Sequence, residues 1–199
     1  MSARIKPFPS GYFSQSAIEA VLDLRSRIPS IDDIKEVRLQ TFPSGHQVMG
    51  SSKANWNPET RESADHSLPF VMAVALMEGG LEIRHYDEEY YKRPDVRALM
   101  QKISVRIGDE PTKAWPNVPL NIVDIETRSG EVLSTKVAYH LGHFKRLMSD
   151  EEQERKFRPM AEALLPKSQT DSLLACLRRL ERLEHIGDLI SMTVAPSLS

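Results

Sequence analysis

The segment from Thr60 to Gly80, TRESADHSLPFVMAVALMEGG, decides how this chain folds. Between Leu68 and Met77 nearly every side chain is apolar, and no polar face interrupts the run. A helix that is apolar all round belongs in the interior of a protein. The pair Gly79-Gly80 supplies residues that commonly cap a helix at its C-terminus. We therefore expect a buried helix here, at the centre of the hydrophobic core.

Three ionisable side chains, Arg61, Asp65 and His66, stand just before that helix. In a structural interpretation, Ser63 or Ser67 caps the helix, Asp65 complements its positive N-terminal dipole, and His66 bonds a nearby backbone group. In a functional interpretation, exposed amides at the helix start act together with Arg61 and His66 to bind a carboxylate. The two interpretations are compatible.

The composition excludes several classes of protein. With 199 residues, 40% of them hydrophobic and 27% charged, the chain is long enough to bury a core and is not disordered. Its 26 basic and 28 acidic residues are mixed along the chain, without the basic excess of a nucleic-acid-binding protein. The single cysteine, Cys176, excludes an internal disulfide and a cysteine-based zinc site. We expect a cytoplasmic protein without a membrane span or a signal peptide.

Local patterns on both sides of the central segment indicate a mixture of helices and strands. The expected elements are a helix over Ser14–Arg27, a strand over Ile34–Phe42, a polar loop over His46–Thr60, a helix from Pro94, a strand over Ile103–Ile107, and a hairpin formed by Leu120–Arg128 and Glu131–Tyr139. The hairpin would turn at Ser129-Gly130. Together these elements predict an α+β fold, an antiparallel sheet of about four strands packed with helices.

The last 51 residues, 149–199, read as helical. Ser149 and Glu152 have the spacing of a capping box, which marks a helix start. Pro166 separates that helix from a last one, which carries a leucine stripe from Leu173 to Leu183. We therefore divide the chain into an α+β body, residues 1–148, and a C-terminal helical segment, residues 149–199.

Several short motifs resemble those of one enzyme family, MmgE/PrpD, which includes 2-methylcitrate dehydratase. Arg61–Phe70 resembles the family's T-A-D-H-S-L-P-Y segment, and Lys6–Pro9 resembles the K-P-Y-P entry to its second domain. Ser14–Ala20 resembles the S-Q-T-A-V-E-A that follows. Further matches fall at Arg93–Arg97, Gly142-His143 and Glu154–Phe157. Because the motifs keep their order over nearly the whole chain, the resemblance covers the family's second, C-terminal domain.

The resemblance implies a particular organisation. In this family a helical domain comes first and supplies most catalytic groups, and the α+β domain with its C-terminal helices follows. This chain resembles only the second part, so the N-terminal helical domain is expected to be absent. The stripe from Leu173 to Leu183 would then lack a partner within the chain, which predicts a homo-oligomer or a hetero-oligomer with a helical-domain chain.

The resemblance also implies a chemistry, the elimination of water from a small tricarboxylate without any cofactor. A base removes a proton beside a carboxylate, an acid protonates the departing hydroxyl, and cationic groups hold the negative charges. By position in the motifs, Lys6 would be the catalytic residue, binding a carboxylate or stabilising enolate charge, and Arg61 and His66 would bind the substrate. The structural alternatives are a solvated lysine for Lys6 and a helix cap for His66.

Two departures from the family pattern keep other functions open. Gly11 stands where relatives place Cys, His or Glu, and Phe13 stands where the dehydratase branch has His. Both lose polar side chains, which favours a non-catalytic oligomerising or regulatory remnant, whereas the retained Lys6 and His66 favour the enzyme. We do not expect the isolated chain to be active. A third possibility is a cis-aconitate decarboxylase-like or iminodisuccinate epimerase-like enzyme, because both belong to the same family.

The remaining conspicuous residues receive structural interpretations. His140 and His143 lie beside Lys145 and Arg146 without matching carboxylates, so we expect a basic loop and no metal site. We read the segment from Tyr86 to Tyr91 as a solvated surface segment. The two tryptophans, Trp56 and Trp115, are expected to pin loops to the body of the protein.

Overall fold

The structure, a computed structural model, describes residues 3–196, and for Glu88 and Glu89 it describes only the backbone. The described residues fall into two compact units. One ends at Leu147 and contains all four strands, and the other begins at Met148 and is helical. We call them the sheet unit and the helical unit.

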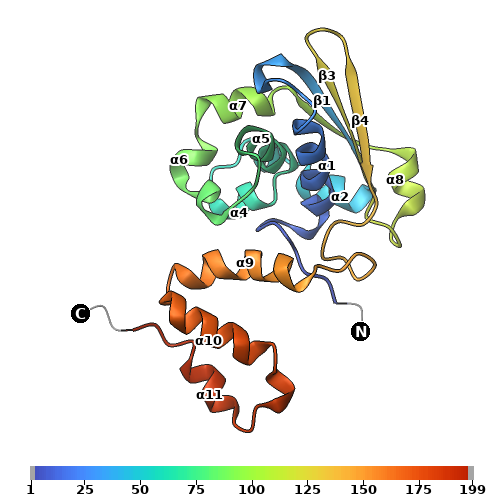
Figure 1. Cartoon of the computed structure of the whole chain (residues 1–199). Coiled ribbons are helices and arrows are strands. Elements are labelled where there is room, and N and C mark those ends of the chain that lie inside the picture. The colour runs from blue at the N-terminus through green and yellow to red at the C-terminus, as the bar shows by residue number, and fades with distance from the viewer. Residues whose placement is uncertain (1–2, 197–199) are drawn as a thin grey trace. The chain divides into compact units, whose positions relative to one another are not determined.

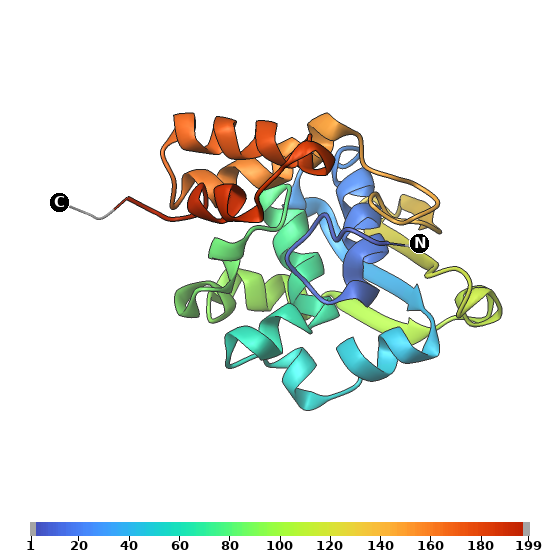
Figure 2. The ribbon, with the colours of Figure 1, turned by 90° about the horizontal axis from the view of Figure 1, so that it is seen from below.

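The sheet has the order β2-β1-β3-β4 and is mixed rather than antiparallel. Its strands are β1 (Ile34–Thr41), β2 (Ile103–Ile107), β3 (Asn121–Thr127) and β4 (Val132–Val137). β1 runs parallel to β2 (Figure 2) and antiparallel to β3; in the parallel pair Val37 lies opposite Ile103. The α+β class is confirmed, and the expectation of an antiparallel sheet is wrong for this one pair. A parallel pair needs a long crossover, which residues 42–102 provide.

The hairpin between β3 and β4 is confirmed. The two strands pair antiparallel along their length, from Asn121 opposite Val137 to Glu126 opposite Val132. Gly130 lies in the turn with φ +88°, a value that favours glycine.

One side of the sheet is covered by helices that place the apolar segment in the core (Figure 1). They are α1 (Gln15–Arg25), α5 (Leu68–Glu78) and α7 (Pro94–Met100). α1 packs against α5, β3 and β4, and α5 packs against β2 and α7. Every residue of α5 from Leu68 to Leu76 is buried, and Gly79 ends the helix with φ +73°. The buried helix and its glycine cap are both confirmed.

The segment expected to be a loop contains short helices instead. They are α2 (Pro43–Met49) and α3 (Lys53–Trp56), followed by α4 (Arg61–Asp65). α3 and α4 each begin with a capping box, formed by Ser52 with Asn55 in α3 and by Thr60 with Ser63 in α4. Local side-chain hydrogen bonds therefore sustain helices that are too short to show hydrophobic periodicity.

The segment from Tyr86 to Tyr91 is not simply solvated, which corrects the sequence interpretation. It spans the end of η3 (Ile83–Tyr86) and α6 (Glu88–Tyr91). The side chains of Tyr86 and Tyr91 are only 4% and 5% exposed, because both rings join the hydrophobic core. The sheet unit is completed by three short elements: η1 (Tyr12–Ser14), η2 (Ile31–Asp33) and α8 (Asp109–Ala114).

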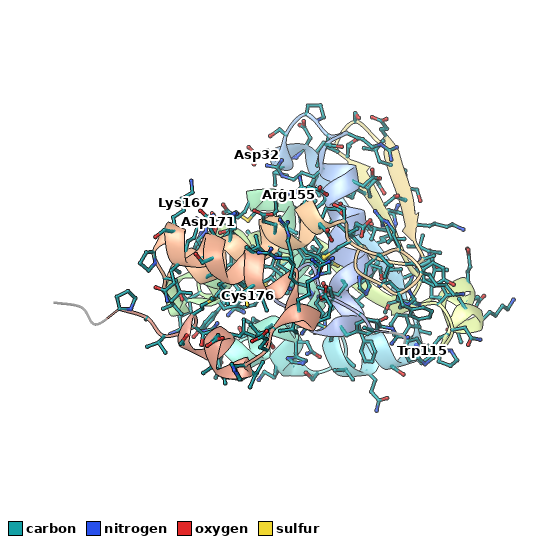
Figure 3. All side chains as sticks on the ribbon, turned by 60° about the horizontal axis from the view of Figure 1, so that its bottom comes forward. Asp32, Trp115, Arg155, Lys167, Asp171 and Cys176 are labelled. Atoms are coloured by element: carbon teal, nitrogen blue, oxygen red, sulfur yellow. The ribbon has the colours of Figure 1, made fainter. Side chains whose placement is uncertain are left out.

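The helical unit contains α9 (Asp150–Glu162), α10 (Lys167–Leu177), η4 (Leu180–Arg182) and α11 (Ile186–Ser191). The capping box of Ser149 and Glu152 at the start of α9 is confirmed. The expected single last helix is wrong, since α10 ends at Leu177 and the leucine stripe continues into η4. Cys176 lies on α10 (Figure 3). Within residues 3–196 no helix is both long enough and apolar enough to cross a bilayer.

Candidate functional site

The loop that carries the Lys6–Pro9 motif is held by one buried side chain, that of Gln15 at the start of α1. Its Oε1 accepts a hydrogen bond from the amide of Phe8 at 3.1 Å, and its Nε2 donates to the carbonyl of Phe8 at 3.2 Å. The same Nε2 lies within hydrogen-bonding distance of the carbonyls of Ser10 (3.2 Å) and Gly11 (3.3 Å). The backbone of this loop is therefore fixed at its middle and at its end.

The serines on either side of Gln15 extend this anchoring. The hydroxyl of Ser14 donates to the carbonyl of Gly11 at 2.8 Å. The hydroxyl of Ser16 donates to the carbonyl of Pro119 at 2.7 Å and accepts from Nδ2 of Asn121 at 2.7 Å. The Ser-Gln-Ser sequence thus joins the loop, α1 and the start of β3.

The loop is also joined to the segment that precedes α5. The carbonyl of Asp65 accepts hydrogen bonds from the hydroxyl of Ser10 at 2.9 Å and from the amide of Gly11 at 3.1 Å. Two motifs that are more than 50 residues apart in the sequence therefore meet in space.

His66 lies at this meeting point, as the residue that follows α4. Its Nδ1 contacts Oδ1 of Asp65 and lies 3.3 Å from the carbonyl oxygen of Glu62. Its own carbonyl accepts from Nδ2 of Asn55 at 2.8 Å. Half of the imidazole side chain is exposed. The contact with Asp65 orients the ring while leaving it accessible to solvent.

The start of α5 does not provide the free amides of the functional interpretation. The hydroxyl of Ser67 accepts from the amide of Phe70 at 3.1 Å, and Pro69 has no N–H. Leu68, Pro69 and Phe70 are all buried. Ser67 is confirmed as the cap of this helix, whereas Ser63 belongs to the capping box of α4.

Tyr86 joins the same site, which the sequence interpretation did not foresee. Burial raises the pKa of its phenol well above the usual value, while the Ser10 hydroxyl and the Arg61 guanidinium act in the opposite direction and Asp65 raises it further. The ring is nearly inaccessible to solvent. The signal available in the sequence was a tyrosine that follows Ile83 at helical spacing, which favours burial.

Arg61 and His66 lie at the two ends of α4. Lys6 comes from a different segment, the anchored loop before α1. Arg61 is the exposed first residue of α4. Lys6 is exposed too, and it enters the anchored loop four residues before Ser10. We refer to the gathered residues as the Asp65 cluster: Ser10, Gly11, Arg61, Asp65, His66 and Tyr86.

The small size of Gly11 leaves room for the side chain of Met49 beside His66. A Cβ at this position would lie 2.9 Å from Sδ and Cε of Met49 and 3.5 Å from Cδ2 of His66. The φ of Gly11 is −51°, which any residue adopts, so the backbone does not require glycine. The buried side chain of Met49 therefore occupies space beside His66 that a larger residue at position 11 would need.

Phe13 belongs to an aromatic group rather than to the Asp65 cluster. Its ring lies edge-on to Phe42 (5.4 Å between centroids) and to Trp115 (5.6 Å), and the latter two stack at 4.3 Å. Nε1 of Trp56 donates to the carbonyl of Gly50 at 2.9 Å. Both tryptophans tie their segments to the body of the sheet unit, as expected.

His140 and His143 are both buried, and Nδ1 of each has a backbone partner. Nδ1 of His140 lies 2.7 Å from the carbonyl of Leu141, and Nδ1 of His143 accepts from the amide of Lys145 at 3.1 Å. Desolvation lowers the pKa of both imidazoles, which favours their neutral forms. Across residues 3–196, no three His, Cys, Asp or Glu side chains are grouped so that they could hold a metal ion.

An open hollow of about 490 Å³ lies elsewhere on the sheet unit, between α1 and β4. Its charged lining residues are Glu19, Asp23, Lys136, Lys145 and Arg146. It contains neither Lys6 nor any member of the Asp65 cluster, and its Arg146 is paired with Glu19. The hollow is therefore separate from the residues that the motifs single out.

Comparison with known proteins agrees with this placement of the motifs. The profile of the MmgE/PrpD C-terminal domain matches residues 8–182. The human cis-aconitate decarboxylase is 26% identical over 140 residues, which cover 70% of this chain and 29% of that protein. The 2-methylcitrate dehydratase of Salmonella typhimurium is 28% identical over 152 residues, covering 70% of this chain and 30% of that protein.

A third relative, the mitochondrial 2-methylcitrate dehydratase of Yarrowia lipolytica, is 25% identical over 151 residues, covering 70% of this chain and 28% of that protein. The chain therefore spans about 30% of the length of the curated relatives it matches. The matched region contains the Asp65 cluster and the anchored loop from Phe8 onward, and Lys6 and Pro7 lie just before it. This chain belongs to the MmgE/PrpD family, through its C-terminal domain.

Proposed function

We propose that this chain contributes one wall of a hydro-lyase site that eliminates water from a small tricarboxylate, as a 2-methylcitrate dehydratase does. The observation that carries the proposal is the joining of Ser10 and Gly11 to Asp65. Those hydrogen bonds hold the Lys6 motif and the Arg61–His66 segment in one fixed arrangement. A substrate with several carboxylates needs cationic groups that are held in such an arrangement.

Each predicted residue has a role in that reaction. The ammonium of Lys6 binds a substrate carboxylate and stabilises the negative charge that develops when the neighbouring carbon loses its proton. The exposed guanidinium of Arg61 pairs with a second carboxylate. His66 contacts Asp65 through Nδ1, so its interaction with the substrate goes through Nε2.

The reaction also needs groups that the described cluster does not supply. A base takes the proton from carbon, the C–O bond breaks, and an acid protonates the departing hydroxyl so that water leaves. We propose that a helical domain on a partner chain carries these groups and completes the site. The curated enzyme relatives extend beyond the region that this chain matches, which is about 30% of their length.

Two alternatives follow from specific observations. The match to human cis-aconitate decarboxylase supports decarboxylation, in which a C–C bond breaks, carbon dioxide leaves and the remaining carbanion takes up a proton. The same cations would stabilise that carbanion. The replacement of polar residues by Gly11 and Phe13 supports a non-catalytic oligomerising remnant, because Met49 and the aromatic group fill the space.

The first test is the identity of the partner. The tagged chain is recovered from its own cells, its size is measured by light scattering, and co-purifying polypeptides are identified by mass spectrometry. We expect a helical-domain polypeptide, and we expect the complex to convert 2-methylcitrate to an unsaturated product. Release of carbon dioxide from cis-aconitate would identify the decarboxylase instead. If only copies of this chain are recovered, and neither substrate is converted, the protein is the non-catalytic oligomerising remnant.

The second test concerns Lys6 in the active complex. Lys6→Ala should lower kcat by about 100-fold or more, because a charge that stabilises the transition state is lost. Lys113→Ala, which removes an exposed lysine of α8, is the matched control and should leave kcat unchanged. Unchanged turnover in Lys6→Ala would remove Lys6 from the site.

A further inference from the structure

The segment before Lys6 crosses a tight loop, residues 139–146, at a glycine. The amide of Ile5 donates to the carbonyl of Gly142 at 2.8 Å. We propose that Gly142 is a positioning residue for Lys6, because it lets the backbone of Ile5 lie against the loop and so fixes where Lys6 begins. The inference rests on the proposed function for its link to catalysis, but the contact itself does not.

Gly142 cannot be replaced without moving Ile5. A Cβ built on it would overlap the carbonyl oxygen of Ile5 and would lie 3.1 Å from the carbonyl carbon. These are backbone atoms, so no side-chain rotation relieves the overlap. The φ of Gly142 is +85°, a conformation that other residues rarely adopt.

The loop that carries Gly142 is itself rigid. The amide of Gly142 donates to the carbonyl of Arg146 at 2.8 Å, and the amide of Arg146 donates to the carbonyl of His143 at 2.7 Å. Glu19 of α1 accepts from the amide of Leu141 at 2.9 Å and pairs with Arg146. The loop is thus closed on itself and anchored to a core helix.

The residue before Ile5 strengthens the contact. The guanidinium of Arg4 lies over the rings of Tyr12 and Phe144, at 5.1 Å and 5.4 Å from their centroids. Cation–π contacts of this kind contribute on the order of 1 kcal/mol each. Two consecutive residues, Arg4 and Ile5, are therefore held to the sheet unit.

Lys6 consequently lies between two fixed points. Ile5 is held before it by Gly142, and Phe8 is held after it by Gln15. Pro7 fixes its own φ and restricts the backbone of the preceding residue, which is Lys6. The direction in which the Lys6 side chain leaves the backbone is therefore determined by Gly142 and Gln15 together.

The chain offers a matched control for testing Gly142. Gly130 has nearly the same φ, +88°, and beyond its own atoms and its two chain neighbours no described atom lies within 4 Å of the position where its Cβ would stand. Gly130→Ala therefore introduces the same backbone strain as Gly142→Ala without the overlap. Any difference between the two variants reports the contact with Ile5.

The experiment measures hydrogen exchange of the Ile5 amide and the ¹³C signal of Lys6 after reductive methylation, in the full chain. In Gly142→Ala we expect exchange to become at least about tenfold faster and the Lys6 signal to move toward that of a solvated lysine. Gly130→Ala should change neither. Ile5→Pro, which removes the donor from an exposed segment, is the second variant should Gly142→Ala fail to fold, and it should shift the Lys6 signal in the same way.

In an active complex, Gly142→Ala should also lower kcat by about 100-fold with little change in KM, since a small misplacement of a catalytic group has this effect. If the Lys6 signal and the Ile5 exchange are unchanged, the positioning role is wrong. Normal kcat despite faster exchange would also overturn it. If wild-type complex has no activity, the proposed function fails while the Lys6 signal still decides whether Gly142 positions Lys6.

Discussion

The sheet unit and the helical unit are stabilised in different ways. The sheet unit contains a continuous core in which α5 is buried from Leu68 to Leu76. In the helical unit no residue of α9 or α11 is buried, and Ile186, Ile190 and Val194 are all about 60% exposed. Its helices are linked by ion pairs, such as Arg158 of α9 with Asp171 of α10 at 2.7 Å. The candidate site therefore lies on the unit with a core, while the other unit presents apolar side chains to solvent.

The largest predicted effect is on the core of the sheet unit. Phe70→Ala should lower the free energy of unfolding by about 3–5 kcal/mol, because it leaves a cavity in a fully buried site. Ile190→Ala in the helical unit should change it by no more than about 0.5 kcal/mol. Both tryptophans, Trp56 and Trp115, belong to the sheet unit, so their fluorescence during urea unfolding follows that unit alone. Circular dichroism reports the helices of both units, so an unfolding step seen by it but not by fluorescence belongs to the helical unit. An equal loss of stability for Ile190→Ala in that step would mean that both units have cores.

The next effect compares two glutamines that anchor backbone carbonyls. Gln15→Ala should cost about 2 kcal/mol, because it leaves buried backbone groups of the Lys6 loop without partners. Gln169→Ala, whose Nε2 donates to the carbonyls of Met192 and Val194 near the chain surface, should cost less than about 1 kcal/mol. Urea unfolding measures both, with fluorescence following the sheet unit for Gln15→Ala and, for Gln169→Ala, the part of the circular dichroism change that fluorescence does not follow. A silent Gln15→Ala would show that the loop does not depend on its anchor.

Helix caps give a smaller contrast. Ser67→Ala should cost about 1–2 kcal/mol, and Ser149→Ala about 0.5–1 kcal/mol. The difference arises because the Ser67 hydroxyl is buried and also contacts the carbonyl of Asn55, whereas Ser149 is exposed. Thermal unfolding of each variant, with a serine-to-threonine exchange as the conservative control, checks the order. A larger loss for Ser149→Ala would contradict it.

The effect that is smallest at neutral pH concerns the buried histidines His85, His140 and His143 of the sheet unit. Desolvation lowers the pKa of each below the ordinary value of 6.5. The unfolded chain therefore binds more protons as the pH falls below 6.5, so the sheet unit should lose stability between neutral pH and about pH 5. Fluorescence-detected unfolding over that range measures the slope. The double variant His140→Gln and His143→Gln should flatten it, and an unaltered slope would show that these two histidines are not its source.

Much of the sheet unit could be predicted because its signals are local. The apolar run of α5 and the Ser129-Gly130 turn each determine their own element. The parallel pairing of β1 with β2 has no local signal, because it depends on how residues 42–102 pack. The short helices α2 and α3 were missed for a different reason, since a helix of only one or two turns buries too few residues to show a period.

The candidate site was predictable only in part. The motifs singled out Arg61 and His66, and the structure brings them to one cluster with Asp65. The participation of Ser10 and Tyr86 depends on contacts between segments that are distant in sequence. The role of Gly142 could not be read from its surroundings in the sequence, because the atom that excludes a Cβ belongs to Ile5.

The order of the strands has a consequence for how the chain reaches its native state. β1 lies between β2 and β3, so its pairing partners, Ile103 and Ile125 for Val37, are synthesised much later than β1 itself. Pairings between such distant residues form slowly, whereas the β3–β4 hairpin can form as soon as its two strands have been synthesised. During synthesis the unpaired β1 and the apolar α5 would therefore be exposed together, which makes the nascent chain a candidate for chaperone binding and for aggregation when it is overproduced.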